Sequence, residues 1–318
     1  MKSIAIIVCY FGKFRKDFRM WLKSCEKNST IDWIIFSDCE EQVELPKNVK
    51  IIRKTLQEIK QMAEEKLEIK IYLEEAYKLC DFKVAYGYIF KEYLKDYDYW
   101  GYCDLDMIFG DIRNFLNDNL LGEYDKYYQL GQLSIYANNY ENNTRFMREG
   151  ENLYYKKVFS NHNIFVFDEI AGIYQFYINN NWKMYINDDD YADINKYNKR
   201  LKTTIVKKNF KFQTFLWNDG KLYRIFEDNK GEIVYDELIY IHYSKKEFES
   251  IDSNSFFITN RGFINKNKDL IIDRNVINEM NPARNYIIEI LEYKINRFKF
   301  RLKRKIKKIY KNYKHRKE

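Results

Sequence analysis

Apolar residues in the first fifty positions follow two patterns, continuous short runs and a repeat of every three or four positions. Ile4 to Val8 is an unbroken apolar, mostly β-branched run, which is typical of a strand that a sheet buries on both faces. Phe14 to Cys25 then repeats apolar residues every three or four positions, which indicates a helix. Two short apolar runs, Trp33 to Phe36 and Val49 to Ile52, predict further strands. This order predicts an α/β fold with a doubly wound sheet that binds ligands at the carboxyl ends of its strands.

The remaining body of the chain carries weaker signals of the same kind. We expect helices over Leu56–Tyr77, Tyr86–Tyr93 and Ile112–Leu121, the last capped by Asp111, and strands over Tyr97–Tyr102, Gly131–Tyr136, Ile164–Phe167 and Glu237–Ile241. No internal repeat or low-complexity linker divides these segments, and the chain has only two prolines. The pattern therefore predicts one domain over residues 1–281 and a tail over residues 282–318.

The tail differs from the body in both periodicity and charge. Its apolar residues recur in steps of three or four, at Ile287, Leu291, Ile295, Phe298, Leu302, Ile306 and Ile309. From Arg284 to Glu318 there are fourteen Lys and Arg against three Glu, whereas the rest of the chain has 41 basic and 44 acidic residues. The net charge of +8 thus belongs to the tail. These features predict a basic amphipathic helix that can lie on anionic lipid headgroups.

Composition limits the class and compartment of the protein. A hydrophobic fraction of 46% excludes a disordered chain. The five cysteines are scattered without a CxxC pair, which excludes a disulfide framework or zinc knuckle and is typical of a reducing compartment. The apolar start is too short for a signal peptide, and no apolar run approaches the roughly 20 residues of a membrane span. We therefore expect a cytoplasmic protein.

The strongest chemical signal is the run Tyr99 to Asp111, which places Asp104 and Asp106 one residue apart inside an aromatic, apolar segment. Burying two like charges is costly unless a cation neutralises them. Residues i and i+2 of a strand point to the same side, so both carboxylates can converge on one ion. Oxygen ligands suit Mg²⁺ or Mn²⁺, which also bind phosphates. A solvated turn or helix cap is the usual alternative for such a pair, but the apolar flanks argue against it.

Of the three histidines, His242 has the most informative context. It follows the apolar run that ends at Ile241 and precedes Lys245 and Lys246. This position at a strand end fits either a third metal ligand or a structural histidine, and both alternatives stay open. Either lysine could contact a phosphate as a point charge.

Three further groups of residues are candidates for the site, and each of them also has a purely structural interpretation. Asp81 and Lys83 precede a predicted helix start that could receive a phosphate, or they form a surface turn. Asp168 and Glu169 follow an apolar run and could orient or deprotonate a hydroxyl, or cap a helix. The triplet Asp188–Asp190 could join a site but is more typical of a solvated loop. The chain has no GxGxxG, Walker, GxSxG or HExxH motif.

Taken together, these motifs resemble a family. The segments that carry the resemblance are Tyr10-Phe11-Gly12, Phe36-Ser37-Asp38, Asp81-Phe82-Lys83 with Tyr86-Gly87, Trp100 to Asp106 with Phe109-Gly110-Asp111, and Ile239 to Lys246. They look like those of bacterial glycosyltransferases from capsule and surface-polysaccharide gene clusters, similar to the metal-dependent GT-A class with its Asp-x-Asp motif. The resemblance covers roughly residues 1 to 250. Val84 and Lys246 depart mildly from the family pattern and remove no ligand or charge.

The resemblance implies a fold and an activity. The fold would be a GT-A-like, Rossmann-type nucleotide-sugar-binding sheet flanked by helices, here the catalytic domain, with a C-terminal amphipathic tail. Mn²⁺ or Mg²⁺ held by Asp104, Asp106 and His242 would bind the diphosphate of a sugar nucleotide, expected to be a UDP-sugar. The loops at Tyr10-Phe11 and Phe36-Asp38 would hold its base and ribose. The acceptor would be a lipid-linked or free oligosaccharide at the inner face of the cell membrane, with residues 284–318 on the lipid.

Two other classes of protein fit part of the pattern. A metal-dependent nucleotidyltransferase also binds its metal through carboxylates on an α/β sheet. A non-enzymatic nucleic-acid-binding or membrane-binding protein would explain the basic tail but leaves the aspartate pair without a cation. We therefore expect no nucleic-acid partner.

Overall fold

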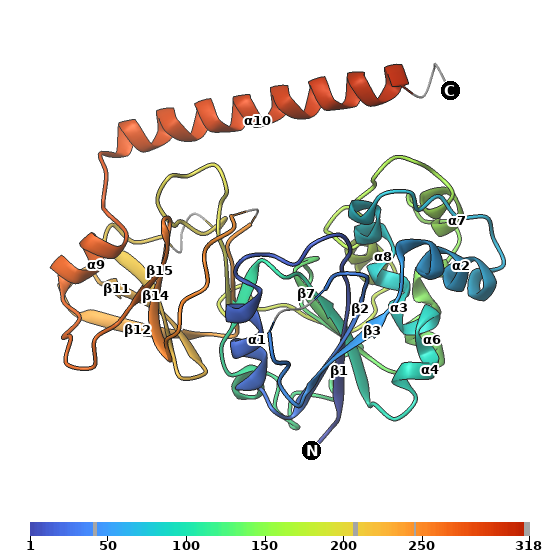
Figure 1. Cartoon of the computed structure of the whole chain (residues 1–318), viewed down its shortest axis with the longest axis horizontal. Helices are drawn as coiled ribbons and strands as arrows, with labels where there is room; N and C mark the ends of the chain where they lie inside the picture. Colours follow the sequence, from blue (N-terminus) through green and yellow to red (C-terminus); the bar gives the residue numbers. More distant parts are fainter. Residues whose placement is uncertain (41–42, 206–208, 245, 315–318) are drawn as a thin grey trace.

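The computed structural model describes residues 1–40, 43–205, 209–244 and 246–314. Its centre is a seven-stranded sheet in the order β3-β2-β1-β4-β7-β6-β8, seen edge-on in Figure 1. The strands are β1 (Ile4–Cys9), β2 (Ile31–Ser37), β3 (Val49–Arg53), β4 (Tyr99–Cys103), β6 (Lys126–Tyr127), β7 (Leu133–Ala137) and β8 (Met184–Tyr185). β3, β2, β1 and β4 run parallel, and β7 joins β4 antiparallel. The predicted α/β class with its parallel sheet is confirmed.

Alternate residues of β1 face two separate hydrophobic cores. Ile4, Ile6 and Val8 pack with the buried residues of α1 (Phe18–Glu26) on one side of the sheet. Ala5 and Ile7 pack on the other side, which most of the remaining helices of the first 180 residues cover (Figure 1). These helices include α2 (Leu56–Leu67), α3 (Tyr86–Ile89), α4 (Lys91–Leu94), α6 (Tyr140–Thr144), α7 (Tyr155–Phe159) and α8 (Ile173–Asn179), together with the 3₁₀ turns η1 (Ala76–Asp81), η2 (Lys83–Ala85) and η3 (Arg145–Met147).

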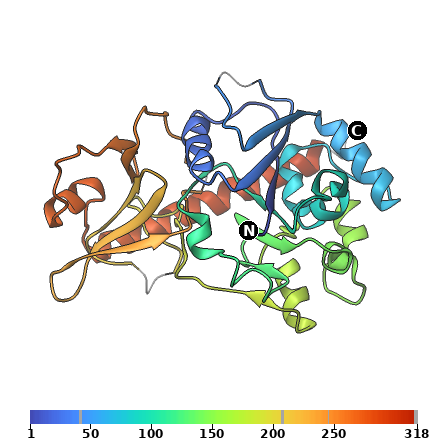
Figure 2. The ribbon, with the colours of Figure 1, turned by 90° about the horizontal axis from the view of Figure 1, so that it is seen from below.

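A second, antiparallel sheet lies beside the first. Of its strands the sequence predicted only the last two residues of one, Glu237 and Leu238. The second sheet has the order β12-β11-β10-β14-β15, from β10 (Gln213–Asn218), β11 (Lys221–Glu227), β12 (Ile233–Leu238), β14 (Ser255–Thr259) and β15 (Gly262–Asn265). Helix α9 (Arg274–Met280) packs on one face of this sheet through Ile277 and Met280. Seen from below in Figure 2, the two sheets stand side by side.

A small third sheet joins the two larger ones. It pairs β5 (Met107–Phe109), β13 (Tyr240–His242) and β9 (Tyr191–Asp193), with β13 in the middle. The predicted strand over Glu237–Ile241 is therefore two strands, broken at Ile239. The N–H of Ile239 donates to the carbonyl of Asp190, and the carbonyl of Ile239 accepts from the N–H of Gly110.

Several predicted helices are shorter than their periodicity suggested. The helix expected to reach Tyr77 ends at Leu67, because Glu68 adopts a left-handed conformation with φ of 53°. Phe90 leaves the helical region and splits the segment of Tyr86–Tyr93 into α3 and α4. The predicted cap by Asp111 is confirmed, but α5 (Ile112–Phe115) ends early.

The strand predicted over Ile164–Phe167 is wrong. This segment is a loop, in which Val166 has φ of 57°. The backbone N–H groups of Phe165 and Phe167 donate to the carboxylate of Asp81 at 3.0–3.1 Å and so have no need of a strand partner. Phe167 is buried in the core on the helix-covered side of the sheet and Phe165 is partly buried against it, so the segment is apolar in the way a buried strand is.

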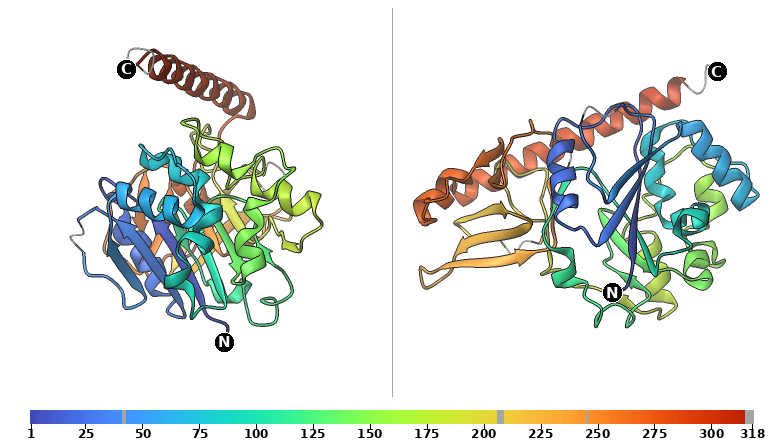
Figure 3. Two further views of the ribbon diagram at one scale, coloured as in Figure 1. Left: turned by 90° about the vertical axis from the view of Figure 1, so that its right-hand side faces the viewer. Right: turned by 60° about the horizontal axis from the view of Figure 1, so that its bottom comes forward.

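The predicted tail helix is present as α10 (Tyr286–Lys314), which runs along one side of the molecule (Figures 1 and 3). Within the described residues, no helix combines the length and apolar character needed to cross a membrane.

Candidate functional site

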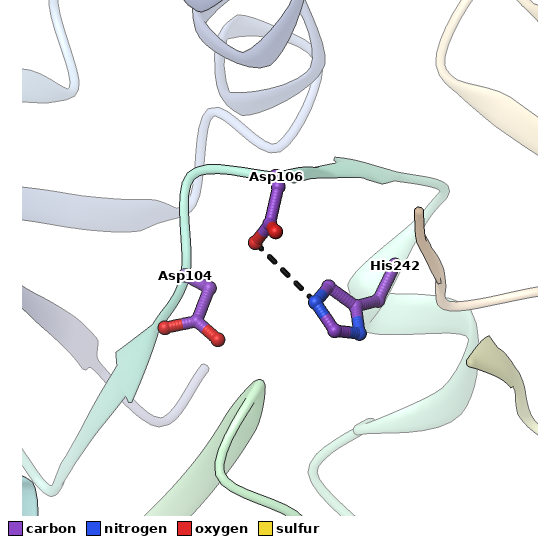
Figure 4. A group of neighbouring side chains, drawn as sticks. All are labelled: Asp104, Asp106 and His242. Atoms are coloured by element: carbon purple, nitrogen blue, oxygen red, sulfur yellow. Dashed lines mark ion pairs between the residues drawn. The ribbon is translucent and has the colours of Figure 1, made fainter. Parts of the chain in front are cut away.

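Asp104 and Asp106 lie in the bend that joins β4 to β5, directly after the carboxyl end of a buried strand. Leu105 between them is buried. The bend is fixed by backbone bonds, since Asp104 N–H donates to Gln132 at 3.0 Å and the Asp106 carbonyl accepts from Tyr243 at 3.0 Å. Both carboxylates point into one space (Figure 4). The side chains are 35% and 16% exposed, so a cation can reach both.

His242 reaches the same space from the middle strand of the third sheet. Its register places it opposite Met107 of β5 and beside Asp193 of β9. The Nε2 atom lies 3.3 Å from an oxygen of Asp106, and Nδ1 lies 2.7 Å from Asp193. One ligand atom from each of Asp104, Asp106 and His242 falls within 4.8 Å of the others (Figure 4). The structure therefore brings together the three residues that the sequence suggested as metal ligands.

The donor set of these three residues fits a divalent cation. Burial lowers the pKa of His242, but the hydrogen bonds to Asp106 and Asp193 outweigh it and raise this pKa to about 10. The protonated ring of His242 thus lies between the carboxylates of Asp106 and Asp193, where a positive charge is stabilised. Because a metal ligand must be deprotonated, a bound ion would take the place of the Nε2 proton while Asp193 kept the ring oriented.

Lys83 connects this cluster to the predicted carboxylates. Its ammonium donates to Asp104 at 2.7 Å and to the Gly131 carbonyl at 2.9 Å, and lies 3.2 Å from Asp168. Burial lowers the pKa of Lys83, but the charges of Asp104 and Asp168 outweigh it and hold the pKa well above its usual value. The lysine is therefore charged and neutralises part of the acidic cluster.

Asp168 and Glu169 lie behind Lys83 in the loop after Val166. Burial raises the pKa of Asp168 to about 6, against the opposing charge of Lys83, and raises that of Glu169 to about 7. Among the described residues, the buried Oδ1 of Asp168 has no hydrogen-bond partner. Gly131 faces this pair so closely that a Cβ there would stand 2.4 Å from Asp168 Oδ2. Burial thus raises the pKa of both carboxyl groups towards neutrality, and one buried acceptor atom of Asp168 is left without a hydrogen bond.

Asp81 lies deeper than its candidate role in nucleotide binding implied. It is fully buried, pairs with the buried Lys78 at 2.7 Å and accepts the backbone N–H groups of Phe165 and Phe167. Lys78 also donates to the carbonyl of Asn163. The pair thus anchors both ends of the loop that carries Asp168.

The loops after β1 and β2 meet at the same edge of the sheet. Asp38 is exposed and accepts from the N–H of Gly12 at 2.9 Å, which ties the Tyr10–Gly12 loop to the end of β2. Tyr10 stacks on Phe14 with ring centroids 5.8 Å apart, and Phe11 is half-buried beside the core.

The segment after His242 packs on the first loop of the chain. Arg15 forms a bidentate pair with the buried Asp17 and donates to the Lys246 carbonyl. Burial lowers the pKa of Lys246. Lys245, the other lysine predicted to contact phosphate, lies outside the described residues. Asp17 and Arg15 were not predicted, since their role depends on a contact between residues more than 200 positions apart.

Two members of the triplet Asp188–Asp190 form hydrogen bonds with side chains outside the cluster around Asp104. Asp188 accepts from Gln129 and Tyr191, and Asp190 accepts from Tyr128 at 2.9 Å. Sequence reasoning also missed Asp193, three positions further on. Its only signal was its place after the short run Tyr191-Ala192, and only the parallel pairing of β9 with β13 sets it beside His242.

The solved structures found similar to the chain have low identity and low TM-scores. Galactosyltransferase LgtC, in complex with donor and acceptor sugar analogs, has 11% identity and a TM-score of 0.31 over 59% of this chain and 75% of its own. Glycosyltransferase GlyE of Streptococcus pneumoniae has 11% identity and a TM-score of 0.30, over 60% and 46%. Mouse xyloside xylosyltransferase 1 has 10% identity and a TM-score of 0.33, over 62% and 88%. Similarity at this level does not by itself indicate a shared activity.

Comparison with curated protein sequences finds no match. A family model does match, over residues 6–267, and its description is a family of unknown function, DUF6625. The matched range contains both large sheets except the first two residues of β1, the third sheet and every residue of the cluster around Asp104. The chain belongs to the DUF6625 family.

Proposed function

We propose that the protein is a metal-dependent glycosyltransferase that moves a sugar from a nucleotide-sugar donor, a UDP-sugar, to a saccharide acceptor. The observation that carries this proposal is the convergence of Asp104, Asp106 and His242 at the carboxyl edge of a parallel sheet. That edge is where α/β sheets bind nucleotides, and the ligand set suits Mn²⁺ or Mg²⁺.

In this proposal the donor lies across the ends of β1, β2 and β4. Asp104, Asp106 and His242 hold the metal, which would offset the charge that develops on the departing diphosphate. Tyr10, Phe11 and Asp38 stand at the ends of the two neighbouring strands, where base and ribose would bind. Lys246 and Lys245 would contact the phosphates as point charges.

The proposal gives the acidic pair a role in activating the acceptor. Asp168 is held 3.2 Å from Lys83, which also binds Asp104, so it lies one side chain away from the proposed metal. A carboxyl group whose pKa lies near 6 or 7 can accept the proton of an attacking hydroxyl at neutral pH. Asp168 or Glu169 would therefore orient and deprotonate the acceptor, and Lys83 would keep Asp104 and Asp168 from repelling each other.

The wider setting is part of the same proposal. Residues 1–281 would form the catalytic domain, and residues 282–318 would hold it at the cytoplasmic face of an anionic membrane. The acceptor would be a lipid-linked or free oligosaccharide in capsule or surface-polysaccharide synthesis. The basic charge of the tail and the resemblance of the sequence motifs support this setting.

The metal site is tested by measuring Mn²⁺ affinity and nucleotide-sugar turnover of Asp106→Ala. We expect the loss of one charged ligand to abolish turnover and to weaken Mn²⁺ binding at least tenfold. Asp269→Asn, which alters an exposed acid in the segment between β15 and α9, is the matched control and should bind Mn²⁺ as the wild type does. Unchanged Mn²⁺ affinity in Asp106→Ala would refute the metal assignment.

The donor is tested by thermal stabilisation with a panel of nucleotide sugars, with and without Mn²⁺, since a ligand stabilises the state it binds. We expect a metal-dependent rise in Tm with a UDP-sugar. Stabilisation by a nucleoside triphosphate alone, with release of pyrophosphate, would indicate a nucleotidyltransferase instead.

A further inference from the structure

The apolar stripe of α10 is exposed along its length. Ile287, Leu291, Ile295, Phe298, Leu302 and Ile306 are between 47% and 67% exposed. They repeat in steps of three and four, so they share one face of the helix. Figure 1 shows α10 as a rod set apart from the two sheets. An exposed apolar stripe of this size marks a contact with something other than water.

The opposite face of α10 is the one attached to the protein. Glu289 is only 9% exposed and pairs with Arg200 at 3.4 Å and with Lys202; we call these three residues the Glu289 clamp. One turn later, Glu292 pairs with Lys199 at 2.6 Å. A further turn on, the Asn296 amide donates to the Tyr197 carbonyl at 3.0 Å. Polar bonds to the loop of residues 196–202 therefore leave the apolar stripe facing away from the body.

The charge of the helix indicates what covers the stripe. Lys294, Arg297, Lys299, Arg301 and Lys305 are exposed on both sides of it, and the segment Arg284–Glu318 carries fourteen basic residues. An apolar stripe bordered by cations over its whole length fits an anionic bilayer surface, where the apolar residues enter the acyl boundary and the cations meet the headgroups.

The candidate site opens on the side of the molecule where α10 lies. In Figures 1 and 3 the N-terminus, just before β1, is at the side of the molecule away from α10. Strand β1 runs from there towards the side of α10, and β4 is parallel to it. Asp104 follows the carboxyl end of β4, so the candidate site faces the same side as the apolar stripe.

The attachment of α10 is close to the site along the chain as well. The loop of residues 196–202 begins three positions after Asp193, which holds His242. The N–H of Ile194 donates to the carbonyl of His242 at 2.8 Å. The helix is thus fastened to the segment that supports the third proposed metal ligand rather than to a distant linker.

We propose that α10 lies in the surface of an anionic bilayer and that the Glu289 clamp holds the carboxyl edge of the central sheet facing that bilayer. Given the proposed function, on which this last step rests, the acceptor is a saccharide on a lipid carrier and reaches Asp168 from the membrane plane. The helix then sets the orientation of the body and is not a flexible tether.

Orientation can be measured without any sugar transfer. A fluorescent donor is introduced through an unnatural amino acid at Lys13, on the site edge, or at Asn119, on the edge near the N-terminus, and vesicles of phosphatidylglycerol and phosphatidylcholine carry a headgroup acceptor dye. Both positions are exposed. We expect energy transfer to the vesicle to be several-fold higher from position 13 than from position 119. Equal or reversed transfer would overturn the orientation.

Flotation with the same vesicles tests the stripe. Leu291→Glu with Ile295→Glu should reduce bound protein at least tenfold. Ile271→Glu alters an isoleucine that is 84% exposed in the segment before α9, and this variant should bind as the wild type does. Failure of the wild type to bind anionic vesicles, or equal binding to neutral ones, would overturn the bilayer as the occupant.

The clamp is tested by Glu289→Gln, which keeps the apolar stripe and the basic residues. This variant should float with vesicles as the wild type does but lose the difference in energy transfer between positions 13 and 119. Retention of the full difference would show that the clamp does not set the orientation. Lys202→Ala provides an independent second variant, and an unchanged Tm of both confirms that the body is folded.

Discussion

Asp193 holds the imidazole of His242 from the side away from Asp106, at 2.7 Å from Nδ1. A carboxylate in this place fixes the ring orientation and leaves Nε2 for a metal, and its loss costs roughly 10- to 100-fold in metal affinity. We therefore expect Asp193→Ala to bind Mn²⁺ that much more weakly in a calorimetric titration. The Mn²⁺ affinity of Asp193→Asn, which can still accept a hydrogen bond, should lie between those of the wild type and the alanine variant. Wild-type affinity in the alanine variant would exclude this supporting role.

Lys126 is a buried cation that gives the stability a measurable pH dependence. Its ammonium donates to the Tyr128 carbonyl and to Ser134 at 2.8 Å, and burial lowers its pKa to about 7, partly opposed by the charges of Glu169 and Asp168. Above pH 7 the unfolded chain keeps a proton on this lysine that the folded protein has lost. This group therefore makes the free energy of unfolding rise with pH until the unfolded lysine itself deprotonates near pH 10.5.

Lys126→Met removes that proton difference. We expect the free energy of unfolding of the wild type, relative to this variant, to rise by up to about 4 kcal/mol between pH 7 and pH 10. Urea unfolding at several pH values measures it. A constant difference across this range would mean that Lys126 titrates normally. Comparing the two proteins cancels the contribution of His242, whose raised pKa has the opposite sign.

At the scale of elements, the loop before Asp168 depends on the buried pair of Lys78 and Asp81. Removing one partner of a buried pair leaves an uncompensated charge, at a cost of about 3–5 kcal/mol. We expect Asp81→Ala to lower the free energy of unfolding by that amount in urea titrations. Glu74→Ala, which breaks the exposed pair with Lys60, should lower it by less than about 1 kcal/mol. Equal effects would argue that Asp81 is not an anchor.

Elements that the apolar pattern predicted well are those whose signal lies in a continuous run of neighbouring residues. Strand β1 and the start of α2 at Thr55, with its capping box to Glu58, are visible in local residues alone. The segment Ile164–Phe167 has the apolar run of a strand because Phe165 and Phe167 pack on the core, while Asp81 takes the hydrogen bonds that a neighbouring strand would have taken. The short strands β5, β9 and β13 have three residues each, too few to show any period.

At the scale of the whole molecule, the position of α10 makes a prediction about salt. Attraction between basic side chains and anionic lipid is screened as ionic strength rises, whereas burial of the apolar stripe is not. We expect vesicle flotation to fall several-fold between 0.1 M and 1 M NaCl but not to vanish. Complete loss at high salt would mean that the stripe does not enter the bilayer, and no change would mean that the charges do not contribute.

The sequence by itself determined the α/β class, the aspartate pair after a buried strand and the basic amphipathic tail, because each is written in neighbouring residues through periodicity, alternation or local charge. Only the tertiary structure decided that His242 and Asp193 meet at Asp106, that Lys83 binds Asp104 and Asp168 together, and that α10 turns its apolar stripe outward on the side of the site. The side-chain contacts join residues 21 to 136 positions apart. Their geometry depends on strand register and packing, which no local pattern records.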